Sequence, residues 1–144
     1  MNSVTKVLVV DDDHDFRNAV SVVLRSAGFE VVVARDGVGA VSTALHEHPD
    51  LVVLDLGLPG GGGVSVLEHY ARFPALWGVP VVVLSGRDPE VVETAIRTHY
   101  VSRVLHKPAS RAQLVDAVER ALDGEVQIRS TAPARVLSHL LHRS

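Results

Sequence analysis

Residues 51–60 have the sequence LVVLDLGLPG, in which four apolar residues are followed by Asp55 and by a loop that contains Gly57 and Pro59. A short, wholly apolar run of this kind predicts a strand that is buried on both faces, as in a parallel sheet covered by helices. Similar runs occur along the chain at Val7–Val10, Val31–Val33, Val81–Leu84 and Val101–Leu105. The sequence therefore predicts five short buried strands, of which residues 51–54 form the third.

The segments between these runs have apolar residues at the spacing of amphipathic helices. Caps, glycines and prolines mark the expected helix boundaries, at Gly28, Asp36, Pro49, Pro74, Asp88-Pro89, Ser110 and Gly124. Strands that alternate with helices predict parallel βαβ units with right-handed crossovers. We expect an α/β fold with a doubly wound, five-stranded parallel sheet in the strand order 2-1-3-4-5.

Composition narrows the classes of protein to consider. The 144 residues are 47% hydrophobic and 22% charged, with a net charge of −3. These values fit one folded domain and exclude a wholly disordered chain. The absence of cysteine excludes a disulfide scaffold, a thiol nucleophile and a zinc–thiolate site.

We expect a cytoplasmic protein, because no apolar run approaches the roughly 18–20 residues of a membrane span and residues 1–6 do not resemble a signal peptide. The mildly acidic charge gives no indication of direct nucleic acid binding.

Polar side chains follow four of the five predicted strands. Asp11-Asp12-Asp13 follows the first, Asp55 the third, Ser85 the fourth and Lys107 the fifth, whereas the second ends in Ala34-Arg35. In the expected strand order, strand 2 lies outside the other four. The carboxyl ends of parallel strands meet at one edge of a sheet, so we expect the four polar groups to converge on one crevice.

The residue types in this crevice suit phosphoryl transfer. Neighbouring carboxylates repel one another unless a cation lies between them, and Mg²⁺ prefers oxygen ligands of this kind. The ammonium of Lys107 and the hydroxyl of Ser85 are suited to binding phosphate oxygens. Asp13 is expected to cap the following helix rather than to bind metal. The set predicts a site at which a carboxylate accepts a phosphoryl group.

Four segments, VLVVDDD, LVVLDLGLPGGGG, VVVLSGRD and LHKPAS, resemble in order the motifs of the receiver domain of two-component response regulators. The resemblance covers about residues 5–123. It implies the flavodoxin-like receiver fold, with a domain over residues 1–124. It also implies a switch in two-component signal transduction, one that assists its own phosphorylation and dephosphorylation but is not an enzyme.

The resemblance also implies roles for individual residues. Asp55 would accept the phosphoryl group from a sensor histidine kinase, a phosphotransfer protein or a small acyl phosphate. Mg²⁺ would be bound by Asp12, Asp55 and the backbone carbonyl of Gly57, with Asp11 contributing through water.

Two further residues would contact the phosphoryl group. Ser85 would donate a hydrogen bond to it and Lys107 would form an ion pair with it. The peptide bond between Lys107 and Pro108 is expected to be cis, a geometry that proline tolerates.

Several positions depart from the family pattern. Gly57 and Gly86 are smaller than the residues usual at these positions, and Arg87 follows Gly86. Val104 and Ala109 stand where an aromatic residue is common. These departures predict an intact phosphorylation site with an altered shielding of the phosphoryl group and an altered readout.

Two other functions compete with this one. A degenerate receiver could act as a protein-binding module without phosphorylation, but the acid, serine and lysine set is complete. A haloacid-dehalogenase-type phosphatase could use Asp13 and Asp15 as its D-x-D pair. That fold needs a further pair of carboxylates after the lysine, and the acids there fall within the last helix.

Residues 125–144 form a tail that is too short for a DNA-binding output domain. An apolar stripe within it comprises Val136, Leu137, Leu140 and Leu141. Such a short helix needs a packing partner. Three arrangements are open: packing against the domain, formation of a homodimer, or a linker remnant. The sequence names no cognate kinase and no downstream protein.

Overall fold

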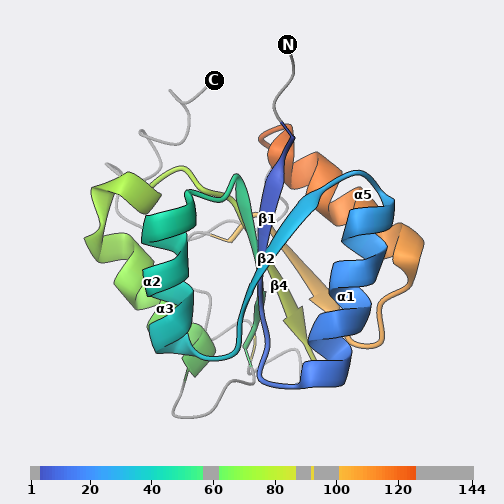
Figure 1. Cartoon of the computed structure of the whole chain (residues 1–144), viewed down its shortest axis with the longest axis horizontal. Coiled ribbons are helices and arrows are strands. Elements are labelled where there is room, and N and C mark those ends of the chain that lie inside the picture. The colour runs from blue at the N-terminus through green and yellow to red at the C-terminus, as the bar shows by residue number, and fades with distance from the viewer. Residues whose placement is uncertain (1–3, 57–61, 87–91, 93–100, 126–144) are drawn as a thin grey trace.

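The computed structural model describes residues 4–56, 62–86, 92 and 101–125. The strands are β1 (Lys6–Val10), β2 (Glu30–Ala34), β3 (Leu51–Asp55), β4 (Val81–Ser85) and β5 (Arg103–His106). All four strand pairs are parallel, and the order across the sheet is β2-β1-β3-β4-β5 (Figure 1). The predicted fold class and strand order are confirmed.

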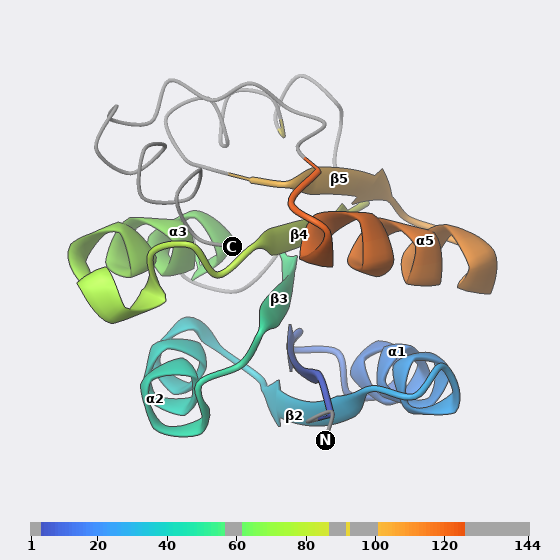
Figure 2. The ribbon, with the colours of Figure 1, turned by 90° about the horizontal axis from the view of Figure 1, so that it is seen from above.

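Helices cover both faces of this sheet. Figure 2 shows α1 (His14–Ser26) and α5 (Arg111–Leu122) on one face, and α2 (Gly37–Glu47) and α3 (Gly62–Arg72) on the other. A short 3-10 helix, η2 (Pro74–Leu76), follows α3. Within the described residues, no helix is long and apolar enough to cross a membrane.

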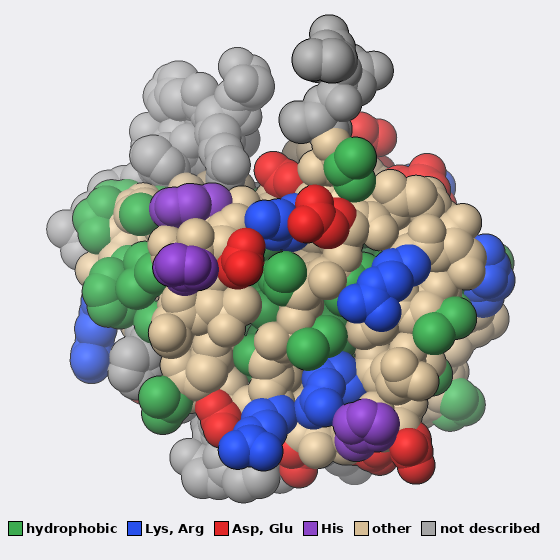
Figure 3. Space-filling view, viewed as in Figure 1, with side chains coloured by type: hydrophobic (Ala, Val, Ile, Leu, Met, Phe, Trp, Pro, Cys, Tyr) green, Lys and Arg blue, Asp and Glu red, His purple; other side chains and the backbone are tan. Residues whose placement is uncertain are grey.

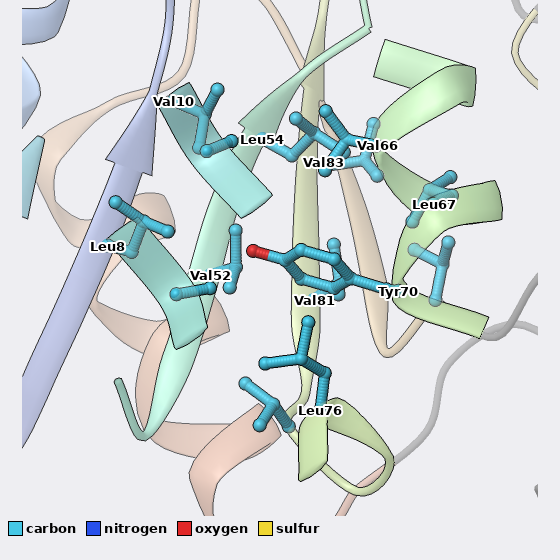
Figure 4. Close-up of a cluster of buried hydrophobic side chains, with 14 of the residues drawn as sticks. Leu8, Val10, Val52, Leu54, Val66, Leu67, Tyr70, Leu76, Val81 and Val83 are labelled. Carbon is cyan, nitrogen blue, oxygen red and sulfur yellow. The ribbon is translucent and has the colours of Figure 1, made fainter. Parts of the chain in front are cut away.

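Alternate residues of the central strands supply two separate cores. On β3, Val52 and Leu54 belong to the core on the α2 and α3 side, whereas Leu51 and Val53 belong to the core on the α1 and α5 side. Figure 4 shows part of the first core, where Tyr70 of α3 lies among aliphatic side chains. Since both faces of these strands are buried, their sequences are continuous apolar runs rather than alternating ones.

Three of the predicted helix N-caps are present in the described part of the chain. Asp13 accepts hydrogen bonds from the backbone N–H groups of Asp15 and Phe16, and Asp36 accepts one from Gly39. Ser110 forms a capping box with Gln113 at the start of α5. These side chains satisfy N–H groups that have no partner within the helix, so the sequence sets where each helix begins.

The fifth strand begins later than predicted. Val101 is fully buried but precedes β5, which begins at Arg103. The apolar run was misleading because Val101 is buried by packing in the core on the α2 and α3 side, without pairing in the sheet. The strand also extends one residue further, to His106.

Two smaller differences concern the ends of β3 and β4. Asp55 and Ser85 are the last residues of these strands and not the first residues after them. The fourth predicted helix, from Asp88, falls outside the described residues except for Val92, which is buried. The apolar stripe of residues 136–141 also falls outside them.

Candidate functional site

Three carboxylates from two strands meet at the carboxyl edge of the sheet. Asp11 and Asp12 follow β1, and Asp55 ends β3. One oxygen from each lies within 4.8 Å of the others. Asp11 is 2% exposed and Asp55 is 7% exposed, whereas Asp12 is exposed to solvent. Figure 3 shows acidic side chains along the lower margin of the molecule, which is the margin where the strands of Figure 1 end.

The loop after β1 is fixed by its own hydrogen bonds. The backbone N–H of Asp13 donates to Asp11 Oδ1 at 3.0 Å, and that of Asp11 donates to the carbonyl of Ala34 at 3.2 Å. Arg17 Nη1 donates to the carbonyl of Asp11 at 2.9 Å. The carboxylate of Asp11 is therefore held toward Asp55 by the backbone.

Asp13 and Asp15 do not form the pair that a haloacid-dehalogenase-type phosphatase would need. The carboxylate of Asp13 is used as the cap of α1. The side chain of Asp15 is fully exposed, beside His14. The sequence interpretation of Asp13 as a cap is confirmed.

Lys107 directly follows β5, the edge strand of the sheet, and its side chain extends to the acidic cluster. Its Nζ lies 3.4 Å from Asp55 Oδ2 and 3.5 Å from Asp11 Oδ2. Its backbone N–H donates to the carbonyl of Ser85 at 2.8 Å, which ties the loop after β5 to the end of β4. The peptide bond between Lys107 and Pro108 is cis. The structure thus brings Asp11, Asp55 and Lys107 together as predicted.

Ser85 and Gly86 lie at the end of β4, beside this cluster. Ser85 is 1% exposed and pairs with His106, directly before Lys107. A Cβ atom added to Gly86 would lie 3.9 Å from Cβ and Cδ of Lys107, which is ordinary van der Waals contact. The site therefore has room for a methyl group at residue 86.

The pKa of Asp11 is raised, which indicates that the acidic cluster contains too little positive charge to balance its carboxylates. Burial raises the pKa of Asp11 above its ordinary value, and the neighbouring Asp55 raises it further. The backbone N–H of Asp13 and the ammonium of Lys107 act in the opposite direction but do not reverse the shift. Carboxylates outnumber the ammonium of Lys107 in this cluster, so the donor set fits a hard divalent cation with oxygen ligands.

The sequence interpretation missed one neighbour of the lysine. Phe16, in the first turn of α1, lies with its ring centroid 4.1 Å from Lys107 Nζ. Its helical spacing assigned it to the core, and it does pack there as a partly buried residue. Its place in the turn directly after the acidic loop was a signal for a second contact.

Some positions expected near the site can be placed and others cannot. Val104 is partly buried beside the core on the α2 and α3 side and pairs with Val83 of β4. Gly57 and Arg87 lie outside the residues that the structure describes.

Comparison with known proteins agrees with this geometry. The model of the response regulator receiver domain family matches residues 7–119. The phosphate regulon transcriptional regulatory protein PhoB of Escherichia coli is 32% identical over 117 residues, which cover 81% of this chain and 51% of that protein. The DNA-binding response regulator MtrA of Mycobacterium tuberculosis is 33% identical over 133 residues, covering 92% of this chain and 55% of that protein. The chain thus spans about half the length of these curated relatives.

Solved structures have the same fold. A putative response regulator from Chloroflexus aurantiacus superposes with a TM-score of 0.79 at 27% identity, covering 84% of this chain and 99% of that one. The signal receiver domain of the putative response regulator NarL from Mycobacterium tuberculosis gives a TM-score of 0.77 at 28% identity, covering 86% and 100%. The family match over residues 7–119, together with the sheet order and the acidic cluster, establishes that this chain belongs to the response regulator receiver domain family.

Proposed function

We propose that Asp55 accepts a phosphoryl group in a Mg²⁺-dependent reaction and that the chain acts as a switch in two-component signal transduction. The observation that carries this proposal is the convergence of three carboxylates with Lys107 Nζ, 3.4 Å from Asp55 Oδ2. The donor would be the phosphohistidine of a sensor histidine kinase or of a phosphotransfer protein, or a small acyl phosphate.

With acetyl phosphate as the donor, the chemistry is a single displacement at phosphorus. A carboxylate oxygen of Asp55 attacks the phosphorus, the bond from phosphorus to the acetyl oxygen breaks, and acetate leaves with the electron pair of that bond. The product is an acyl phosphate on Asp55. The step as written transfers no proton, because a carboxylate attacks and the acetyl group leaves as acetate.

The other residues would stabilise the charge on the transferred group. The ammonium of Lys107 would contact one phosphoryl oxygen as a point charge, and the hydroxyl of Ser85 would donate a hydrogen bond to another. Asp11, Asp12, Asp55 and the carbonyl of Gly57 would hold Mg²⁺, directly or through water. When bound, the ion would offset the negative charge shared by the carboxylates and the phosphoryl group.

The test is incubation with acetyl phosphate and Mg²⁺, followed by measurement of the intact mass. The expected result is the gain of one phosphoryl group by the wild type, its loss when the metal is chelated, and its absence in Asp55→Asn. Asp123→Asn is the matched control, because Asp123 is an exposed carboxylate at the end of α5. Phosphorylation that persists in Asp55→Asn would contradict the assignment. A wild type that gains no mass would favour a binding module that works without phosphorylation.

A further inference from the structure

Three groups surround the ammonium of Lys107 in the described part of the chain. Two are the carboxylates of Asp55 and Asp11, at 3.4 and 3.5 Å, and the third is the aromatic ring of Phe16, with its centroid 4.1 Å away. Strong hydrogen bonds between an ammonium and a carboxylate are shorter, at about 2.7–2.9 Å. Lys107 is therefore shared between two acids without a tight bond to either, and the ring is an uncharged third neighbour.

A ring in this place can hold an ammonium without neutralising it. The face of an aromatic ring attracts a cation within about 6 Å of its centroid, and the attraction increases when water is excluded. The side chain of Lys107 is 24% exposed, so water only partly competes for it. Unlike a carboxylate, the ring withdraws no charge from the ammonium, which stays available to an incoming phosphoryl oxygen.

We propose that Phe16 is a positioning residue for phosphoryl transfer, in which its ring holds the ammonium of Lys107 at the acidic cluster. This inference rests on the proposed phosphorylation of Asp55. The lysine side chain has four flexible carbons, and without the ring it would sample more conformers and approach the carboxylates more often. Preorganised charge stabilises a transition state more than charge that must move into place.

The position of Phe16 is itself well determined. Its backbone N–H donates to Asp13 Oδ1 at 3.1 Å, within the cap of α1. Its side chain packs against the core on the α1 and α5 side, together with Leu105 of β5. Groups built on a helix whose side chains are packed are held more precisely than groups on loops. Asp13 thus places Phe16, and Phe16 in turn places Lys107.

The simpler explanation is that Phe16 only fills the core, and Phe29 provides a control for it. Phe29 is a partly buried phenylalanine in the same core. It directly precedes β2, whereas Lys107 directly follows β5, so the two lie at opposite edges of the parallel sheet. Replacement of either phenylalanine by leucine removes a ring from this core, but only one replacement removes a ring next to the lysine.

The experiment compares Phe16→Leu, Phe16→Tyr and Phe29→Leu with the wild type. Thermal unfolding first checks that each variant is folded. The rate of phosphorylation by acetyl phosphate is then measured at saturating Mg²⁺, since a small donor avoids any contribution from the docking of a kinase. In parallel, NMR records the ε-methylene protons of Lys107, which a nearby ring face shifts upfield.

The expected rate for Phe16→Leu is about three- to tenfold below the wild type, a loss on the scale of one cation–π contact. Phe16→Tyr retains a ring and should restore most of the rate, and Phe29→Leu should stay within about twofold of the wild type. The upfield shift of Lys107 should disappear only in Phe16→Leu.

Three results would overturn the inference. They are an unchanged rate in Phe16→Leu, an equal loss in Phe29→Leu, or a Lys107 shift that does not depend on the ring. A wild type that is not phosphorylated at all refutes the proposed function, and the positioning role falls with it. A wild type that is phosphorylated together with an unaffected Phe16→Leu refutes the inference alone.

Discussion

The ammonium of Lys107 lies 3.5 Å from Asp11 Oδ2, across a separation of 96 residues in the chain. After the hydrogen bond from the backbone N–H of Asp13, it is the second compensation for a carboxyl group that is almost fully buried and close to Asp55. The compensation is incomplete, because the pKa of Asp11 remains raised. The arrangement suits a site that binds a cation, but it lowers the stability of the metal-free protein.

Asp11→Asn should therefore stabilise the metal-free protein at neutral pH. Asparagine keeps an oxygen that can accept the hydrogen bond from the N–H of Asp13, and it removes the buried charge. The expected gain in the free energy of unfolding is about 0.5–2 kcal/mol, which is the usual gain from a single stabilising substitution. The measurement is denaturant unfolding in the presence of a chelator.

The pH dependence of this gain follows from the direction of the shift. The folded pKa of Asp11 lies above its ordinary value of 3.8, so the folded state binds more protons than the unfolded state between these two values. The stability of the wild type therefore falls as the pH rises through this window, and Asp11→Asn does not share that loss. The difference between the two should be small below the ordinary pKa and largest at neutral pH.

Asp50→Asn serves as the control for this prediction. Asp50 is exposed at the opposite edge of the sheet, where its Oδ2 accepts a hydrogen bond from the N–H of Lys6. The expected change is within about 0.5 kcal/mol, as for most surface substitutions. If Asp11→Asn loses stability at neutral pH without metal, the buried charge of Asp11 does not destabilise the fold.

Much of this site could be predicted from the sequence, because its parts are encoded locally. Apolar runs that end in Asp11, Asp55 and Ser85 give the strands, and parallel pairing then brings their ends together. The caps Asp13 and Ser110 are equally local signals.

Other features depend on packing between distant elements, which periodicity does not show. Phe16 has the spacing of a core residue and is one, so its contact with Lys107 appears only once α1 and β5 are placed. In the same way, Val101 is buried without belonging to the strand. In both cases burial could be predicted from the pattern of apolar residues, whereas the identity of the neighbour could not.

The hydroxyl of Tyr70 is buried without a hydrogen-bond partner among the described residues. Figure 4 shows it directed between aliphatic side chains toward Val52. Burial raises the pKa of Tyr70, consistent with an apolar surrounding. A buried polar group without a partner costs about 1–3 kcal/mol. Tyr70→Phe keeps the ring and should leave the protein equally stable or more stable.

Chemical denaturation of Tyr70→Phe and Tyr70→Ala tests this interpretation. The alanine variant loses the ring and should be destabilised by about 3–5 kcal/mol, as for other large aromatic truncations. A loss of more than about 1 kcal/mol in the phenylalanine variant would mean that the hydroxyl has a partner and stabilises the fold.

Gly86→Ala should leave the fold unchanged and lengthen the lifetime of phosphorylated Asp55. An added Cβ would contact the Lys107 side chain at 3.9 Å, so no backbone or side chain must move. The methyl group would exclude water beside the phosphoryl site, and hydrolysis should slow severalfold. The measurement is the decay of the phosphorylated mass after removal of the donor. Equal decay in both proteins would show that residue 86 does not control access of water.

Val104 bears on how phosphorylation would reach the surface of the domain. The family resemblance implies that the hydroxyl at the end of β4 moves toward the phosphoryl group and that an aromatic residue on β5 turns inward. Here that residue is Val104, which pairs with Val83 and is partly buried beside the core. Valine is small and its χ1 angle is restricted, so it cannot act as such a rotor. Phosphorylation shifts a conformational equilibrium only by the difference in free energy that it creates between the states.

With Ser85 and Lys107 as the remaining contacts, the response should be largest around Asp55 and weak at residues 91–98 and 103–105. Backbone amide shifts with and without beryllium fluoride, a mimic of the phosphoryl group, measure this directly, with Val104→Tyr as the variant expected to strengthen the remote response. Remote shifts in the wild type as large as those around Asp55 would show that the face switches without an aromatic residue.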